Sequence, residues 1–208
     1  MLNVEARPRG QTFAQFFADG AGSTSYMELP AQELLRRRSR GSDSGSQLRE
    51  HELYLVQHPV DVAPPLWMRA SGLPVESANL WMSGSPDGGE VSACHFDLSD
   101  NLVTMIAGSK TFTLIPPGDT PLIYPAQPGN ARSFEPPYSS IRDVSIDGFA
   151  SSNMTERQRW PRLAWARRTS VVLQPGDVLF LPRLWWHQVA NAPAPSTSLN
   201  FWFRNAHK

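Results

Sequence analysis

Short apolar runs separated by turn residues fill most of the chain from Glu52 onward. The runs are rich in β-branched and aromatic side chains and are bounded by Gly, Pro, Asn, Asp or Ser, which is typical of β-strands. The expected strands cover residues 52–57, 79–83, 101–108, 110–117, 170–177, 178–182, 185–190 and 198–203. Residues 86–89 and 107–110 are typical of tight turns. Many short strands with such turns predict an all-β barrel or sandwich.

The first fifty residues follow a different pattern. Apolar residues at three- and four-residue spacing predict a short amphipathic helix over 11–18. A second helix is expected over 30–38, with proline in its first turn and arginines near its end. Residues 36–47 are rich in Ser, Gly and charge and predict a mobile loop, with a basic anchor or nuclear address as the alternative. We therefore expect a helical N-terminal flank over 1–50.

A proline-rich, irregular stretch interrupts the strand pattern from about 116 to 168. Its helical part is Asn153 to Trp160, which Pro161 ends. A long irregular insertion in a compact β domain is often functional, for instance as a loop that covers a substrate. No internal repeat or second domain is visible, so residues 1–208 are expected to form one domain with its barrel over 52–203.

Composition narrows the class of protein. Hydrophobic residues make up 40% and charged residues 18%, which excludes a disordered chain. The 19 basic and 19 acidic residues cancel, so neither nucleic acid nor an anionic membrane is an expected partner. The single cysteine, Cys94, excludes an intrachain disulfide and a cysteine-ligated cluster, and it favours a reducing compartment, the cytoplasm or the nucleus of a eukaryotic cell. No apolar run approaches the roughly 20 residues of a membrane helix, and no secretory signal is expected.

Three residues carry candidate metal chemistry. His95 and Asp97 are two residues apart in extended chain, so both side chains point to the same face. His187 lies in a predicted strand behind two tryptophans and is the candidate third ligand. Two histidines and one carboxylate form the facial set that holds non-haem Fe(II) and leaves open positions for substrates. The alternatives are a hydrogen-bonded His–Asp pair and a core histidine.

Four blocks of sequence, HFD at 95–97, 101–117, 175–187 and NFW at 200–202, with a weaker block at 54–56, resemble the cupin-like JmjC hydroxylases. The resemblance is closest to the branch with the asparaginyl hydroxylase of hypoxia-inducible factor and the lysyl hydroxylase JmjC proteins. It implies a mainly β fold, a double-stranded β-helix (a jelly-roll or cupin barrel) with a few short flanking helices. It also implies an oxygenase that uses Fe(II), 2-oxoglutarate and O2.

The resemblance assigns roles residue by residue. His95, Asp97 and His187 match the iron ligands. Lys110, fifteen residues after His95, matches the lysine that pairs with the distal carboxylate of 2-oxoglutarate. The other residues at co-substrate positions are Asn101, Asn200, Ser92 and Tyr54. The expected substrate-pocket residues are Trp202 and Trp186.

Purely structural roles are alternatives for several of these residues. Lys110 could be an exposed turn lysine, Asn200 could make a purely structural hydrogen bond, and Tyr54 and Trp202 could be packing residues. Cys94 is expected to face away from His95 as a small packed residue that is prone to oxidation.

The resemblance implies hydroxylation of a C–H bond, with 2-oxoglutarate decarboxylated to succinate. Hydroxylation is expected rather than demethylation, since Asp97 stands where many demethylases of the family have Glu, and a protein side chain is the expected target. Alternatives are the same chemistry on a small molecule or peptide natural product, on an RNA base, or an inactive metal-binding cupin that serves as a binding module. Val56 replaces a substrate-contacting glutamine. Related hydroxylases often continue into C-terminal helices that build a dimer, whereas this sequence ends at Lys208, so dimerisation is left open.

Overall fold

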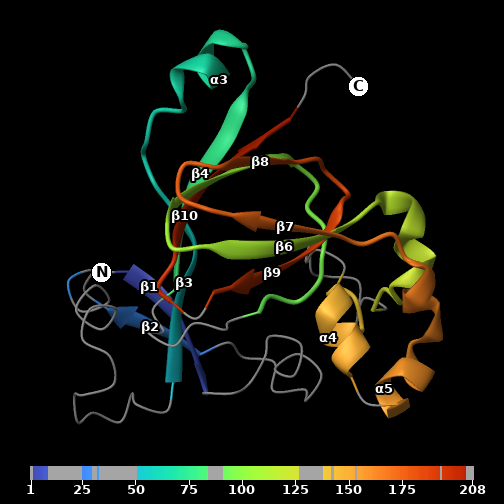
Figure 1. The fold of residues 1–208 in the computed structure, drawn as a ribbon. Coiled ribbons are helices and arrows are strands. Elements are labelled where there is room, and N and C mark those ends of the chain that lie inside the picture. The colour runs from blue at the N-terminus through green and yellow to red at the C-terminus, as the bar shows by residue number, and fades with distance from the viewer. Residues whose placement is uncertain are drawn as a thin grey trace.

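The computed structural model describes residues 2–8, 25–29, 32, 51–83, 91–126, 138–141, 143–152, 154–192 and 194–204. Antiparallel strands dominate these residues and form two facing sheets, with short helices outside them (Figure 1). The mainly β jelly-roll fold expected from the sequence is confirmed. Among the described helices, none is long and apolar enough to cross a membrane.

The strands form a larger and a smaller sheet. The larger sheet has the order β2-β1-β3-β4-β10-β5-β8, and the smaller has the order β7-β6-β9. The strands are β1 (Leu2–Pro8), β2 (Ser25–Leu29), β3 (His51–Pro59), β4 (Val75–Ser83), β5 (Asp100–Ala107), β6 (Lys110–Ile115), β7 (Thr169–Leu173), β8 (Val178–Leu181), β9 (Trp186–Asn191) and β10 (Thr197–Phe203). Residues 91–95 extend the smaller sheet along β9 through bridges at Val91 and His95. Every strand expected after Glu52 is therefore present.

The N-terminal flank differs from its prediction. The described residues of 1–50 are the strands β1 and β2 and the single helical residue Gln32. A helical flank was wrong for 2–8 and 25–29, and the sequence holds the reason. Residues 2–8 alternate apolar and polar side chains, which is the period of a strand. The helices expected at 11–18 and 30–38 lie outside the described residues apart from Gln32, as do the 36–47 loop and the 86–89 turn.

Helical elements lie outside the sheets. They are α3 (Leu66–Ala70), η2 (Pro117–Leu122), α4 (Ile146–Ser151), α5 (Met154–Arg159) and η3 (Pro161–Trp165). All but α3 belong to the insertion expected over 116–168, and α5 confirms the helix expected there. In Figure 1, α4 and α5 lie at the lower right, beyond β6 and β9.

Three apolar clusters hold the layers together. One cluster joins the facing sheets and includes Val103, Met105, Phe112 and Leu173. A second lies between the larger sheet and α3 and includes Met68, Leu102 and Phe201. The third lies between the smaller sheet and the insertion, and its buried members are Cys94, Ile115, Ile123, Ile141, Val144, Phe149, Leu163, Ala166 and Trp186. We call this third set the outer cluster.

The interior of the barrel is polar on one side. Strand alternation gives one face to Lys110, Phe112 and Leu114 of β6, and Leu114 pairs with His187 on β9. On the opposite sheet, β3, β4, β5 and β10 contribute Tyr54, Trp81, Asn101 and Asn200, which contact one another or Lys110. Buried polar side chains need hydrogen-bond partners, so this lining is costly unless it is satisfied. The arrangement is typical of a binding interior.

Candidate metal centre

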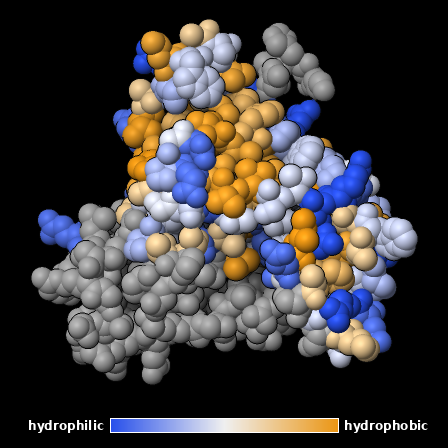
Figure 2. Space-filling model, in the orientation of Figure 1, coloured by the Kyte–Doolittle hydropathy of each residue, from blue (hydrophilic) through white to orange (hydrophobic). Residues whose placement is uncertain are grey.

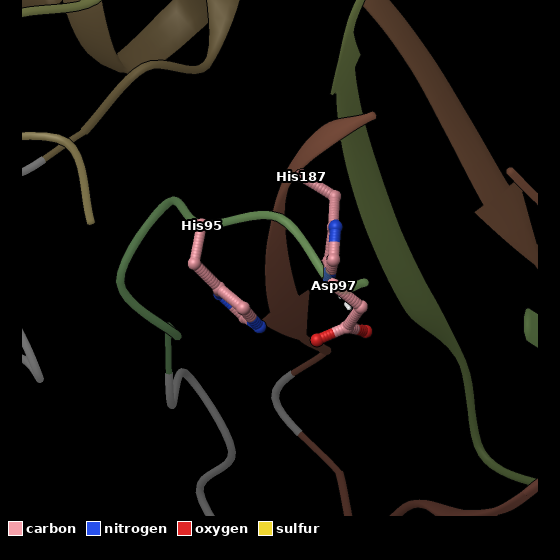
Figure 3. A group of neighbouring side chains, drawn as sticks. All are labelled: His95, Asp97 and His187. Atoms are coloured by element: carbon pink, nitrogen blue, oxygen red, sulfur yellow. Dashed lines mark ion pairs between the residues drawn. The ribbon is translucent and has the colours of Figure 1, made fainter. Parts of the chain in front are cut away.

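Three side chains with metal-binding atoms converge beside the start of β9. Their ligand atoms all lie within 4.8 Å of one another, and His187 Nε2 lies 3.9 Å from Asp97 Oδ2. Figure 3 shows the His95 and His187 rings and the Asp97 carboxylate pointing toward a common point. Within the described part of the chain, no other group of three His, Cys, Asp or Glu side chains lies as close together.

Strand pairing brings the ligands together. His95 N–H donates to the carbonyl of His187 at 3.0 Å, and His187 N–H donates to the carbonyl of His95 at 2.7 Å. Residues that exchange both backbone hydrogen bonds are directly opposite each other, so their side chains share a face. The two ring centroids are accordingly 4.3 Å apart. Asp97 follows two residues later along the extended segment.

Each histidine ring is oriented by one of its nitrogens. His95 Nδ1 lies 2.8 Å from the carbonyl oxygen of Ala93, and His187 Nδ1 lies 3.1 Å from that of Trp185. A carbonyl can only accept, so each Nδ1 carries the proton and donates it. Both Nε2 atoms are left with a lone pair, which is the form in which histidine binds a metal.

Burial sets the protonation of the site. It lowers the pKa of His187 to about 3, with a smaller contribution from His95, so the His187 ring is neutral. Burial also raises the pKa of the Asp97 carboxyl, and the neighbouring His95 opposes that rise. A neutral imidazole and a carboxylate out of bulk water form a donor set suited to a divalent cation, whose charge would offset the burial of Asp97.

A strained turn fixes Asp97 relative to β9. The carbonyl of Asp97 accepts a hydrogen bond from Leu184 N–H at 2.8 Å, and the Asp100 carboxylate accepts one from Arg183 N–H at 2.9 Å. Leu184 has a φ of 68°, a left-handed conformation that costs a non-glycine residue about 1 kcal/mol or more. The strain is tolerated where it joins the turn before His187 to the carboxylate ligand.

Lys110 is a buried cation inside the barrel. Its side chain is 3% exposed, Nζ donates to Tyr54 Oη at 3.2 Å, and Nζ lies 5.5 Å from the centre of the Tyr54 ring. The alternative of an exposed turn lysine is wrong. No carboxylate of the described residues forms an ion pair with it. A buried ammonium without a counter-ion is costly, so this position is suited to an anionic ligand.

A hydrogen-bonded network of one indole and two side-chain amides lies next to Tyr54, the partner of Lys110. Trp81 Nε1 donates to Asn200 Oδ1 at 2.7 Å, and Asn200 Nδ2 donates to Asn101 Oδ1 at 3.0 Å. The Tyr54 and Trp81 rings lie 6.3 Å apart, which links the amides to the lysine. Four of the predicted co-substrate residues, Lys110, Tyr54, Asn101 and Asn200, therefore lie in one polar interior.

Comparison with known families identifies the class of this barrel. The family model of the cupin-like domain matches residues 3–208, nearly the whole chain. The chain belongs to the cupin-like JmjC family. Its His-Asp-His group and polar interior are thus features of a cupin-like barrel.

Curated relatives of this cupin-like chain carry several names. It is 29% identical to HSPB1-associated protein 1 of Bos taurus over 195 residues, which cover 86% of the chain and 37% of that protein. It is 24% identical to lysine-specific demethylase JMJ31 of Arabidopsis thaliana over 238 residues, covering 98% of the chain and 40% of that protein. Jumonji C domain-containing protein 5 of Drosophila melanogaster is 29% identical over 171 residues, covering 79% of the chain and 38% of that protein. The chain thus spans 37–40% of the length of these relatives.

The remaining predicted site residues, Trp186, Ser92 and Trp202, occupy three different environments in the cupin-like barrel. The Trp186 side chain is fully buried in the outer cluster, where its indole donates to Thr120 Oγ1 at 2.9 Å, so it does not line a substrate pocket. It precedes the inward-facing His187 and by alternation must face outward. Ser92 Oγ accepts the Val189 backbone N–H at 2.9 Å and so ties the segment before His95 to β9. Trp202 follows Asn200 on the inner face of β10, and its Nε1 is buried without a partner among the described residues.

Cys94 corrects another expectation. It faces away from His95 into the outer cluster, as predicted, but it is 0% exposed. Burial raises the pKa of its thiol. A buried, protonated thiol is inert, so the expectation that it is prone to oxidation was wrong.

Three residues near the site were missed in the sequence. Successive side chains of a strand point to opposite faces, so Trp81 of β4 lies on the face of the strand opposite to Leu80 and Met82, which is the inner face of the barrel. Gln188 is buried, accepts Val144 N–H and donates to the carbonyl of Ser92, which ties the insertion to the ligand strands. Tyr138 of the insertion bridges to His95, with the two rings 5.7 Å apart. No local pattern marks Tyr138, because its position depends on how the insertion folds back.

Proposed function

We propose that this chain is an Fe(II)- and 2-oxoglutarate-dependent oxygenase that hydroxylates a C–H bond of a protein side chain. The observation that carries the proposal is the close approach of two imidazoles and one carboxylate, with their ligand atoms within 4.8 Å, inside a barrel that also buries Lys110. Relatives named as a lysine-specific demethylase and as a JmjC domain-containing protein support the same class of enzyme.

The donor set fits Fe(II). Two nitrogens and one oxygen are the set that non-haem Fe(II) oxygenases use, and three ligands leave positions open for other molecules. His95 Nε2, His187 Nε2 and an Asp97 oxygen would hold the ion. The hydrogen bonds from each Nδ1 to a backbone carbonyl keep the rings in the ligating tautomer. When bound, iron and 2-oxoglutarate supply the oxidising chemistry of the reaction, which protein side chains lack.

The polar interior fits 2-oxoglutarate, which carries two carboxylates. Lys110 would bind the distal carboxylate by a charge-assisted hydrogen bond, and the Tyr54 hydroxyl that now accepts from Nζ could donate to the same group. The amides of Asn101 and Asn200 offer further hydrogen-bonding groups from the larger sheet, which also carries Tyr54. A role for Ser92 is less direct, because its Oγ already accepts from Val189.

The remaining task of the protein is to orient the target carbon and exclude water. Phe112, Met105 and Leu114 supply a dry wall on the apolar side of the barrel. Excluding water protects a reactive centre from side reactions. Asp97 as the carboxylate ligand favours hydroxylation over demethylation by the family resemblance.

The test is an anaerobic titration of the protein with Fe(II) and 2-oxoglutarate, followed by the weak visible charge-transfer band of the complex. Wild type should show the band. Lys110→Ala should need at least about tenfold more 2-oxoglutarate to reach it, because a charge-assisted hydrogen bond contributes about 1.5–3 kcal/mol. Arg69→Ala, on the exposed face of α3, is the matched control and should behave as wild type.

One result would contradict the proposal, and another would contradict the role of Lys110. Absence of the band in folded, iron-containing protein would favour a metal-binding cupin that acts as a binding module. An unchanged affinity for 2-oxoglutarate in Lys110→Ala would mean that another cation holds the carboxylate. With the band established, succinate release on addition of candidate peptides or small molecules would separate a protein substrate from a small-molecule substrate.

A further inference from the structure

The end of the insertion concentrates positive charge. Residues 157–168 contain five arginines and no Asp or Glu, although the whole chain has equal numbers of basic and acidic residues. Three of these arginines have structural partners. Arg167 pairs with Asp119 at 2.8 Å, and Arg168 donates to the carbonyls of Val144 and Ser145. Arg157 donates to the carbonyl of Ala150.

The other two arginines are stacked on aromatic rings. The Arg159 guanidinium lies 4.8 Å from the centre of the Trp160 ring, and that of Arg162 lies 4.2 Å from the centre of the Tyr124 ring. The two rings meet edge to face at 4.9 Å. We call Tyr124, Arg159, Trp160 and Arg162 the arginine–aromatic cluster. Arg162 also donates its backbone N–H to the Tyr124 hydroxyl at 3.1 Å. A guanidinium that lies over a ring can still offer N–H groups at its edge to a carboxylate.

Within the described residues, neither of these two guanidinium groups has an acidic side chain as an ion-pair partner. Both side chains are exposed. The nearest acid along α5, Glu156, accepts a hydrogen bond from the Trp160 indole at 3.0 Å. Two preoriented cations without counter-ions therefore face solvent on one side of the insertion. Figure 2 shows strongly hydrophilic side chains among apolar ones near α5, at the lower right of the view.

An exposed tryptophan lies next to this charge. Trp165 is 80% exposed and follows Arg162 by three residues in the 3₁₀-helix η3. Side chains three residues apart in a 3₁₀-helix eclipse each other, so both project from the same side. A large aromatic side chain beside an arginine is the composition found at the centres of protein interfaces.

This surface and the segments that carry the candidate metal ligands pack on the same apolar cluster. Leu163 and Ala166, which flank Trp165, are buried in the outer cluster. That cluster also contains Cys94 and Trp186, the sequence neighbours of His95 and His187. The same apolar contacts therefore support both the exposed cations and the strands that carry the candidate ligands, one layer apart. A segment bound here would have a fixed position relative to the site.

We propose that the arginine–aromatic cluster and Trp165 form a docking surface for an acidic polypeptide segment that also carries an apolar side chain. This segment belongs to the protein substrate and is distinct from the residue that is hydroxylated, an assignment that rests on the proposed function. Carboxylates would bind the N–H edges of Arg159 and Arg162, since guanidinium and carboxylate groups match in geometry. The apolar side chain would cover Trp165.

An acidic polypeptide fits this surface better than nucleic acid. Affinity for nucleic acid grows with the number of phosphates that a protein neutralises, and strong binders use many. Two unneutralised guanidiniums on a chain without net charge offer few such contacts. They suffice for one or two carboxylates of a short peptide motif.

The test measures binding directly, by fluorescence anisotropy of a fluorescein-labelled peptide in which glutamates flank a central phenylalanine. The full chain should bind this peptide, and added salt should weaken the complex. Arg159→Glu/Arg162→Glu should weaken binding at least about tenfold, as expected when charge-assisted hydrogen bonds are lost. Arg69→Glu, which reverses an exposed arginine on α3, should bind as wild type does.

Two milder variants guard against loss of structure. Arg159→Gln/Arg162→Gln keeps long side chains over the rings and removes the charge, and Trp165→Ala changes an exposed side chain. Both should keep the far-ultraviolet circular dichroism of wild type and weaken the peptide complex. Unchanged peptide affinity in these two variants would overturn the proposal. It would also be overturned if unlabelled oligo(dT) displaced the peptide at lower concentration than the unlabelled peptide does.

The outcome is separable from that of the proposed function. Peptide binding needs no turnover and is measured with and without Fe(II). A chain that binds the peptide through this surface but gives no charge-transfer band would retain the docking surface and lose the oxygenase assignment. A chain that gives the charge-transfer band but does not bind the peptide would keep the oxygenase assignment and lose the docking surface.

Discussion

The two nitrogens of each candidate histidine ligand have different roles. In His95 and His187, Nδ1 is committed to a backbone carbonyl, so ring orientation and tautomer are fixed by the same strands that bring the residues together. The Nε2 lone pair is thereby presented to Asp97 and to any shared cation. Preorganised ligands of this kind lose little freedom on binding a metal.

His187→Ala should remove Fe(II) binding. Loss of one of three ligands leaves the buried Asp97 carboxylate with a single histidine, and we expect affinity to fall by at least about a hundredfold, more than the loss of an outer-shell partner causes. The measurement is an anaerobic competition titration against a metal-binding dye. His58→Ala is the control, because His58 lies on β3 opposite Leu80 and outside the His-Asp-His group. Equal losses in the two variants would show that the ligands are assigned wrongly.

Cys94 should be unreactive in the folded protein. Its side chain is 0% exposed, and a thiol reagent must reach sulfur to react. Ellman's reagent should therefore label no thiol in native buffer and one thiol per chain in urea. Rapid labelling of the native protein would mean that the outer cluster opens easily.

Strand alternation accounts for most of what the sequence predicts at single residues. It correctly gives His95 and Asp97 one face and Cys94 the other, and it also shows why Trp186, next to His187, cannot line the interior. Tyr138 could not be predicted, because its bridge to His95 joins segments with no local signal for pairing.

At the scale of elements, the turn between β5 and β6 is constrained both by its backbone conformation and by close packing. Gly108 has a φ of 69°, and a Cβ there would collide with the carbonyl oxygen of Pro195 and lie 2.9 Å from Ser196 Cα. Gly176, between β7 and β8, also has a positive φ of 95°, but a Cβ there would meet nothing within 4 Å. Comparing alanine substitutions at the two glycines therefore distinguishes the cost of backbone strain, present at both, from that of steric collision, present only at Gly108.

Gly108→Ala should destabilise the protein more than Gly176→Ala. A left-handed alanine costs about 1–2 kcal/mol in either variant, and overpacking at Gly108 adds about 1–3 kcal/mol. The measurement is the free energy of unfolding from urea titrations. Since Lys110 begins β6 two residues after Gly108, the variant should also weaken 2-oxoglutarate binding. Equal free energies in the two variants would mean that the chain near Pro195 moves aside readily.

The elements divide by how local their signals are. The strands after Glu52 could be predicted, because alternation, β-branched residues and turns all agree along a few residues. The strand β1 carries an alternating signal too, but the helical spacing of the residues that follow it obscured this pattern. The insertion could be recognised as irregular, while its fold could not, because η2 and η3 are held by contacts between its two ends.

The whole molecule is a barrel with an outer layer on each side. Apolar surface lies over β7 and β8, where Val172, Val178 and Phe180 are exposed, whereas the surface near α5 mixes hydrophilic and apolar side chains (Figure 2). The insertion layer is the one connected to the candidate site, through the outer cluster, Gln188 and Tyr138. Its attachment to the barrel therefore affects both stability and the site.

The ion pair between Asp119 and Arg167 closes this attachment. Asp119 lies near the start of the insertion and Arg167 near its end, 48 residues apart. The Asp119 carboxylate accepts from Arg167 Nη2 at 2.8 Å, from Nε at 3.1 Å and from the backbone N–H at 2.7 Å. These hydrogen bonds from Arg167 lower the pKa of Asp119 below its usual value.

Asp119→Asn should therefore lower the midpoint of thermal unfolding at pH 7, and the size of this decrease should depend on pH. Because the folded-state pKa of Asp119 lies below the unfolded value of about 3.9, the stabilisation is fully present above that value and is lost as pH falls through the folded pKa. The difference in unfolding midpoint between wild type and variant should be constant from pH 7 to about pH 5 and should shrink below about pH 4. Asp61→Asn, an exposed position, is the control and should show no such difference at either pH. A difference that persists undiminished at low pH would mean that the neutral carboxyl holds the two ends of the insertion as well as the carboxylate does.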